Sequence, residues 1–318
     1  MIDAELLLRR SKRPLVLGMG GGGDVVGALA TAETMRLYDG ADPIVGGLTW
    51  ERRPIDPVPG PRGAGEIEGG EVLATGVMLA GSRTRVRGRD LLFAESRMAA
   101  FLNAPTVLVD ANLGPGAIAD GLARAAAGLR RDLIVFVDVG GDVLAQGDEP
   151  GLRSPLCDAV MLAASERLRQ AGHAVLLGIF GIGCDAELTA DEVLARIADV
   201  AAAGGLCGVR GLTEPVARRL ESAIDLVPTE ASAQAVRAFR GVSGPITIRD
   251  ATRTLQLGPV AAQTFYLDVQ TTISTAGRLA RAVAAASDLQ AANAVLREFG
   301  LATELDSELD AAGALGGA

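Results

Sequence analysis

The chain has 318 residues, of which 49% are hydrophobic, and a formal net charge of -9. An acidic chain lacks the positive field that nonspecific binding to nucleic acid or to an anionic membrane requires, so we expect neither partner. Lys12 is the only lysine and His173 the only histidine, which leaves few candidates for Schiff-base, P-loop or Ser-His-Asp chemistry. The three cysteines are widely spaced and no signal-peptide pattern is evident, so the sequence favours the cytoplasm.

The first predicted element is a strand at residues 15–17, which breaks into a glycine cluster and resumes as a helix reaching Met35. Glycines let the backbone take positive φ and approach a ligand closely, and the free N–H groups of a first helical turn favour an anion. We therefore expect an anion-binding turn made of Gly20, Gly21, Gly22, Gly23 and Asp24.

The same turn satisfies the dinucleotide-fold pattern GxGxxG through Gly18, Gly20 and Gly23. That fingerprint also requires an acidic residue at the end of the second strand, about 20 residues further on. Glu51 lies several residues later than this and is followed by Arg52. The nicotinamide cofactors NAD and NADP are therefore the weaker alternative.

A second strand is predicted from Pro43 toward Trp50, and the proline and glycine density of residues 56–71 indicates an irregular connection. A helix is expected to begin near Glu95. From residue 106 to about 205, apolar strands alternate with helices, one of which has Ser154 as its cap and Pro155 in its first turn. The next helix opens on Thr189 and Glu192, which are spaced as a capping box.

Strands this uniformly apolar are typical of parallel sheets that are covered on both faces. The sequence therefore predicts an α/β fold with a doubly wound, mostly parallel, Rossmann-like sheet and a smaller C-terminal α+β region. We expect a ligand-binding domain over residues 1–210, the α+β region packed on it over 211–305, and a disordered tail over 306–318.

Polar residues follow several predicted strands, and ligands of open parallel sheets bind outside the carboxyl ends of the strands. Asp and Gly also favour turns, so a turn-forming role is the alternative for each member. The residues expected to share this rim are Asp24, Glu51, Arg52, Asp110, Asn112, Asp138, Asp142, Asp148, Glu149, Arg153, Ser154, Asp185 and Glu187.

The segment DVGGDVLAQGDE places four acidic groups close to one buried strand, and we predict catalytic roles for Asp138, Asp142, Asp148 and Glu149. Such a group of carboxylates binds a divalent cation, hydrogen-bonds a ribose, or holds a proton through a raised pKa. If a metal binds, Mg²⁺ on Asp138 and Asp142 fits the sequence best.

Arg153 and Ser154 open the helix that follows this segment. A guanidinium and a hydroxyl at a helix N-terminus suit an anion, whereas the simpler interpretation makes Ser154 only the helix cap. The two roles are compatible with each other.

Three long motifs together resemble the domain-of-unknown-function family 1152: GMGGGGDVVGAL, GGLTWERRPIDPVPGPR and DVGGDVLAQGDEPGLRSPLCDA. The resemblance spans most of the chain and assigns no reaction and no catalytic residue. It implies that residues 20–24, 50–53, 138–149 and 153–158 belong to one site.

The leading expectation is a cytoplasmic enzyme for a small phosphate-, nucleotide- or ribose-bearing metabolite. The glycine turn, Glu51, Arg52, Asn112, Arg153 and Ser154 would bind this substrate, and carboxylates would drive hydrolysis, lysis or group transfer. The alternatives are a nicotinamide-dependent oxidoreductase and a noncatalytic nucleotide-binding sensor or assembly module. The sequence leaves homo-oligomer formation open.

Overall fold

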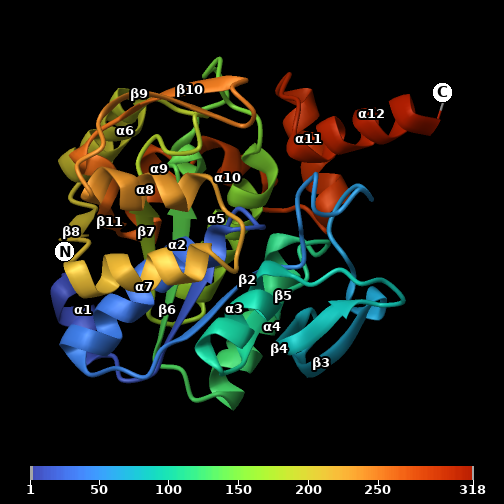
Figure 1. Cartoon of the computed structure of the whole chain (residues 1–318), viewed down its shortest axis with the longest axis horizontal. Coiled ribbons are helices and arrows are strands. Elements are labelled where there is room, and N and C mark those ends of the chain that lie inside the picture. The colour runs from blue at the N-terminus through green and yellow to red at the C-terminus, as the bar shows by residue number, and fades with distance from the viewer. Residues whose placement is uncertain (1–2, 317–318) are drawn as a thin grey trace.

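The computed structural model describes residues 3–316, which form one large sheet with helices on both faces and a separate two-stranded hairpin (Figure 1). The strands are β1 (Pro14–Gly18), β2 (Ile44–Leu48), β3 (Ile67–Ala74), β4 (Val77–Val86), β5 (Thr106–Val109), β6 (Leu133–Val139), β7 (Val175–Phe180), β8 (Leu206–Gly211), β9 (Gly244–Ile248), β10 (Arg253–Leu257) and β11 (Gln263–Leu267). The α-helices are α1 (Ala4–Arg10), α2 (Asp24–Thr34), α3 (Ala94–Leu102), α4 (Pro115–Gly128), α5 (Pro155–Gln170), α6 (Ala190–Ala202), α7 (Glu214–Ile224), α8 (Ala231–Phe239), α9 (Val269–Thr275), α10 (Arg278–Val283), α11 (Leu289–Glu298) and α12 (Glu304–Gly316).

The nine strands of the large sheet lie in the order β3-β4-β5-β2-β1-β6-β7-β11-β8. Its centre, β5-β2-β1-β6-β7, is parallel throughout, and β1 pairs with β2 on one side and β6 on the other. Numbered along the chain, these five strands have the Rossmann order 3-2-1-4-5, in which ligands bind where the order reverses. The predicted doubly wound α/β fold is confirmed, and the reversal lies between β1 and β6.

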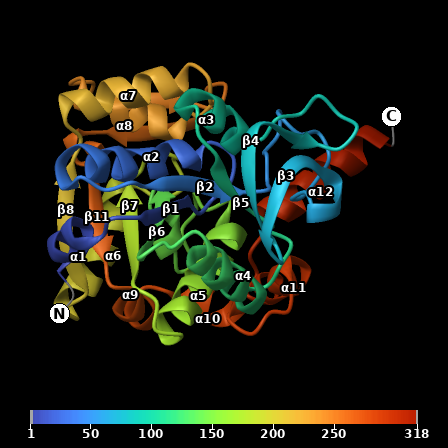
Figure 2. The ribbon, with the colours of Figure 1, turned by 90° about the horizontal axis from the view of Figure 1, so that it is seen from below.

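Two apolar layers cover the sheet, one on each face (Figure 2). Helices α4, α5, α6 and α9 to α11 pack on one face, while α1, α2, α7 and α8 pack on the other. The apolar strands are buried between these layers, with β1, β2, β5, β6 and β7 buried along their whole length. In the described part of the chain, no helix combines the length and the apolar character needed to cross a bilayer.

The C-terminal region takes part in the main sheet rather than only packing on it. Strand β11 lies between β7 and β8 and runs antiparallel to both. At the other edge, β3 and β4 form an antiparallel hairpin, and the first residues of β3 belong to the segment for which the sequence predicted an irregular connection. The parallel core therefore has antiparallel additions on both sides.

The expectation of a disordered tail from Asp306 is wrong for residues 306–316, which belong to α12. Asp306 accepts a hydrogen bond from the backbone N–H of Thr303, and Thr303 accepts one from the N–H of Asp306, so the helix has a capped start. Leu305 is buried, and Glu308 hydrogen-bonds to residues far earlier in the chain. Residues 317–318 lie outside the described part.

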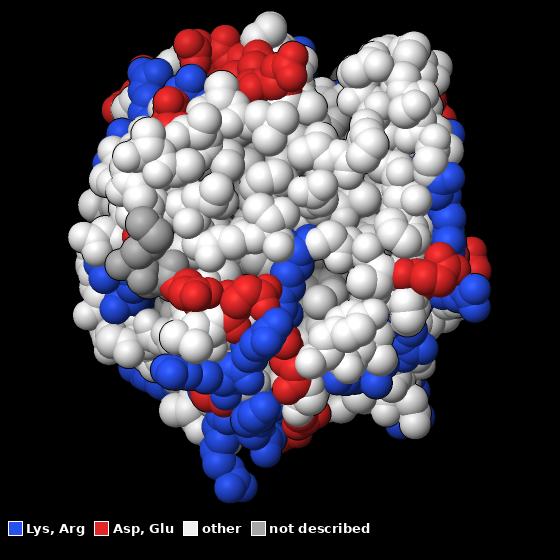
Figure 3. Space-filling view, turned by 90° about the vertical axis from the view of Figure 1, so that its left-hand side faces the viewer, with Lys and Arg blue, Asp and Glu red and all other residues white. Residues whose placement is uncertain are grey.

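On the face at the β8 edge, acidic and basic side chains lie next to one another (Figure 3). Arg210 of β8 pairs with Glu5 and with Asp39, each at 2.6 Å. Charged side chains on an edge strand disfavour edge-to-edge pairing with another sheet. Homo-oligomer formation stays a prediction.

Candidate functional site

The glycine turn after β1 is shaped by two left-handed residues, Gly21 with φ 81° and Gly22 with φ 54°. Two of its N–H groups donate to acceptors of the chain itself: Gly20 donates to the Asp24 carboxylate at 2.9 Å, and Gly22 donates to the carbonyl of Trp50 at 2.9 Å. Burial raises the pKa of Asp24 to about 7, against the lowering effect of the Gly20 hydrogen bond. The turn thus already holds one carboxylate at the position predicted for an anion.

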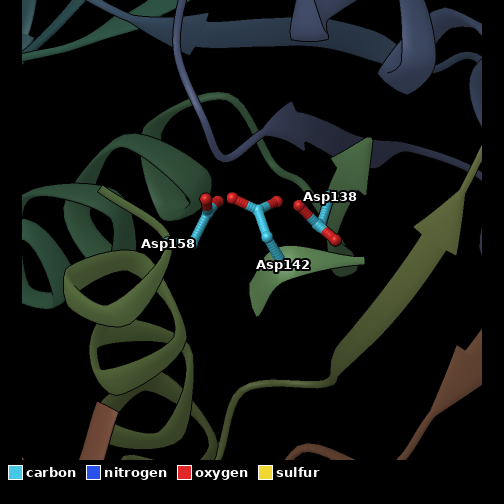
Figure 4. Close-up of side chains that lie close together, drawn as sticks. All are labelled: Asp138, Asp142 and Asp158. Carbon is cyan, nitrogen blue, oxygen red and sulfur yellow. The ribbon is translucent and has the colours of Figure 1, made fainter. Parts of the chain in front are cut away.

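Three buried carboxylates lie beside this turn at the β1–β6 switch point: Asp138, Asp142 and Asp158, which we call the carboxylate triad (Figure 4). Asp138 is on β6, Asp142 opens a 3₁₀ turn (Asp142–Leu144) after β6, and Asp158 is in the first turn of α5. Each is 5% exposed or less, and one oxygen from each lies within 4.8 Å of the others.

Two oxygens of the triad, Oδ2 of Asp138 and Oδ1 of Asp158, have no hydrogen-bond partner among the described residues. Burial, with neighbouring carboxylates adding to it, raises the pKa of Asp138, Asp142 and Asp158 well above the usual range. Burying carboxylates without donors destabilises a fold, and such arrangements are concentrated at functional sites.

A second group of carboxylates shares Asp142 and adds Asp185 and Glu187, again with one oxygen from each within 4.8 Å. Burial and the nearby Glu187 raise the pKa of Asp185 to about 7. Unlike the triad, Glu187 has several donors: the backbone N–H groups of Arg153 (2.7 Å) and Ser154 (2.8 Å), and the Ser154 hydroxyl (2.6 Å). The guanidinium of Arg253, on the β9–β10 hairpin, lies 3.3 Å from it.

These contacts correct the prediction that Ser154 caps its helix. Ser154 is at the N-cap position of α5, but its side chain makes no capping hydrogen bond because its Oγ donates to Glu187. Arg153 is exposed, and its guanidinium donates to the carbonyl of Leu152.

At the N-terminus of α5, the acceptor is instead the carboxylate of Glu304 from α12. It accepts hydrogen bonds from the backbone N–H groups of Leu156 (3.1 Å) and Cys157 (2.9 Å). Arg52 lies between this carboxylate and the glycine turn, donating to the Gly20 carbonyl at 2.6 Å and standing 3.5 Å from Glu304. Its guanidinium stacks over the Trp50 ring, 4.1 Å from the centroid. The glycine turn, the end of β2, α5 and α12 therefore meet at one place.

The remaining predicted site residues lie outside the triad. Asn112 donates to Asp110 at 2.9 Å and to the Pro61 carbonyl at 3.3 Å. Both oxygens of Glu149 accept N–H groups of its own loop, and Asp148 is exposed. A hollow of about 320 Å³ on their side of the molecule is lined by Gln146, Asp148, Glu149, Glu192, Ala195, Arg196 and Arg278. Asp148 and Glu149 therefore lie outside the site that contains Asp142, although they are close to Asp142 in the sequence.

Glu51 is buried at the start of α3, where it accepts the N–H of Ala94. Two residues were not singled out by the sequence for a role: Asp158, present only within a family motif, and Glu304, which falls next to the expected tail. Asp158 reaches the site because of its position in the first turn of α5. Glu304 reaches it through a tertiary contact, which no residue spacing in the sequence indicates.

Glu51→Gln is expected to flatten the pH dependence of stability. Burial raises the pKa of Glu51 from 4.5 to about 7, so its stabilising contribution is complete below pH 4.5 and is lost as the pH rises through 7. At 1.36 kcal/mol per pKa unit, the loss reaches about 3 kcal/mol. Gln still accepts from Ala94, so the Tm of the variant should match wild type at pH 4 and exceed it at pH 8. The exposed Glu71→Gln serves as control; equal Tm values at pH 8 would contradict the prediction.

Fold and site together define an α/β protein with a Rossmann-like parallel core and a buried carboxylate site at its switch point. The family model described as "Protein of unknown function (DUF1152)" matches residues 15–312. The chain therefore belongs to the DUF1152 family, which confirms the resemblance of its motifs. Comparisons with curated proteins and with solved structures find no match for it.

Proposed function

We propose that this protein is an enzyme acting on a small phosphate- or ribose-bearing metabolite at the β1–β6 switch point. The observation that carries the proposal is the carboxylate triad, three aspartates that are 5% exposed or less beside a glycine turn. Apolar residues of similar size would stabilise the fold better than these three buried carboxylates do. A role in binding or converting a substrate best explains why three carboxylates are buried beside a turn that suits an anion.

In this proposal the parts of the site have separate roles. The glycine turn and Arg52 bind the anionic group of the substrate, displacing carboxylates that now take those donors. The triad positions the substrate through its oxygens. Asp24, whose pKa of about 7 lets it exchange a proton at neutral pH, is the candidate general acid–base. The reaction class is hydrolysis, lysis or group transfer.

The two alternatives have weaker support. A nicotinamide-dependent oxidoreductase would use an acidic residue after β2 for a ribose hydroxyl, but Glu51 accepts from Ala94 instead. A noncatalytic nucleotide sensor would need an anion-binding turn and a cation site, but no group such as Asp24 that can exchange a proton near neutral pH.

Thermal unfolding with a ligand panel tests the proposal: inorganic phosphate, ribose 5-phosphate, AMP, ADP, ATP, NAD and NADP. Ribose 5-phosphate or at least one of AMP, ADP and ATP should raise the Tm, since a ligand at 100 times its Kd stabilises by about 2.7 kcal/mol. Arg52→Ala should abolish the shift, and Arg9→Gln, which removes an exposed guanidinium on α1, should keep it. A response to NAD and NADP alone would favour the oxidoreductase, and no response at all would refute the proposed substrate class.

A further inference from the structure

We infer that Asp138, Asp142 and Asp158 are the protein ligands of a Mg²⁺ ion. The inference adds Asp158 to the two aspartates that the sequence suggested, and it does not depend on the identity of the metabolite. Three elements converge to form the site: the end of β6, the 3₁₀ turn that follows it, and the first turn of α5.

The oxygens of the three aspartates suit a divalent cation. Each aspartate offers one oxygen, and the three oxygens lie within 4.8 Å of one another. In octahedral coordination at 2.0–2.1 Å, neighbouring ligand oxygens are about 3 Å apart and opposite ones about 4 Å apart, so small side-chain rotations complete the geometry. Carboxylate oxygens without histidine or thiolate are the ligands that Mg²⁺ and Mn²⁺ prefer.

Two buried oxygens of the triad lack hydrogen-bond partners in the described part of the chain, and this observation is independent of the clustering. Oδ2 of Asp138 and Oδ1 of Asp158 accept no hydrogen bond from any described residue, although these side chains are only 1% and 2% exposed. Both carboxylates are turned toward Asp142 (Figure 4). Within residues 3–316, no salt bridge reaches any member of the triad. A cation among the three carboxylates supplies the missing partner.

Other buried carboxylates near the triad do have hydrogen-bond donors. Glu187 accepts hydrogen bonds from two backbone N–H groups and a hydroxyl, and Glu304 accepts two backbone N–H groups. The triad receives no comparable set. The second acidic group, which adds Asp185 and Glu187 to Asp142, lacks such an orphaned oxygen and is not included.

The position of the site fits an ion that keeps open coordination positions. A Cβ built on Gly20 would lie 3.7 Å from Oδ1 of Asp158, so the ion would sit against the glycine turn. Mg²⁺ held by three carboxylates retains water ligands, and these face the turn, where an anionic ligand can replace them.

Metal-free protein, prepared with EDTA and dialysed, tests the inference with the metal alone. Added MgCl₂ should raise the Tm, and Mn²⁺ binding followed by electron paramagnetic resonance should show one ion per chain that Mg²⁺ displaces. Asp158→Asn and Asp138→Asn should each weaken Mn²⁺ binding by at least about 10–100-fold. Asp120→Asn, on the exposed side of α4, should bind as wild type does.

Wild-type protein that binds no Mn²⁺ and shows no Mg²⁺-dependent Tm would overturn the inference, even if an Asn variant failed to fold. Equal affinity of Asp158→Asn and Asp120→Asn would also overturn it. Because no metabolite is present, failure here is distinguishable from failure of the ligand panel.

Discussion

Asp142→Asn is expected to reduce turnover of any metabolite bound at the site by about 100-fold or more while the fold stays intact. Asp142 is the one residue common to both carboxylate groups, so its loss disturbs positioning on both sides. Removing a group that positions or transfers a proton typically costs about 100- to 10,000-fold. The measurement is the initial rate with the panel compound that gives the largest Tm shift.

In metal-free protein, the same variant should be no less stable than wild type at pH 8. Burial, followed by the neighbouring Asp158, raises the pKa of Asp142, so ionisation of this residue destabilises the folded chain as the pH rises through its folded pKa. Asn removes that ionisation and keeps the size of the side chain. At pH 4 the gain should vanish, because the aspartate is then protonated in the folded state.

A loss of activity without a loss of Tm separates a functional aspartate from a structural one, since proteins retain destabilising groups where function needs them. Unchanged turnover in Asp142→Asn would remove it from the mechanism. A large fall in Tm would instead make it a structural residue, and the triad would lose its main support.

The central part of the fold and one wall of the site could be predicted from the sequence. Apolar strands followed by glycine and aspartate place Gly20 and Asp138 at strand ends, and parallel topology brings such ends to one edge. The capping box of Thr189 and Glu192 was also predictable and is confirmed, because both partners belong to the same helical turn. Local rules succeed where all partners are close in sequence.

The rest of the site depends on the path of the chain after each strand and on contacts between distant segments, which local sequence patterns do not indicate. After Asp142 the chain leaves the switch point, so Asp148 and Glu149 line another hollow, although they lie only a few residues later. Asp158 enters through its position on α5. Ser154 has the ideal residue type for a cap, but Glu187, 33 residues away, accepts its hydroxyl instead.

Helix α12 is the clearest case of tertiary contacts overriding composition. Residues 306–316 are rich in Ala, Gly and acidic side chains, which predicts disorder. The helix is held by carboxylates that find donors elsewhere: Glu304 at α5, and Glu308 at Trp50 and Gly60. Because those donors come from distant parts of the chain, no local pattern could reveal them.

Glu308→Ala is therefore expected to lower the free energy of unfolding by about 2–6 kcal/mol. Oε2 of Glu308 accepts the indole N–H of Trp50 at 3.0 Å and the backbone N–H of Gly60 at 2.8 Å, and the Trp50 side chain is fully buried. Leaving a buried donor without an acceptor costs about 1–3 kcal/mol, and alanine leaves two. Urea unfolding of wild type and variant, followed by the fluorescence of Trp50, the only tryptophan, measures the difference.

Glu308→Gln is the matched control, because its amide oxygen still accepts both N–H groups and its size is unchanged. This variant should lose about 1 kcal/mol or less, so that the gap between the two variants reports the acceptor rather than the packing. The midpoint should fall in Glu308→Ala without a change in the denaturant slope, since the surface exposed on unfolding stays the same. If alanine and glutamine behaved alike, the hydrogen bonds to Trp50 and Gly60 would not be what fixes α12. Its polar anchors would then be Glu304, at the N-terminus of α5, and Asp306, which accepts a hydrogen bond from Asn293 of α11.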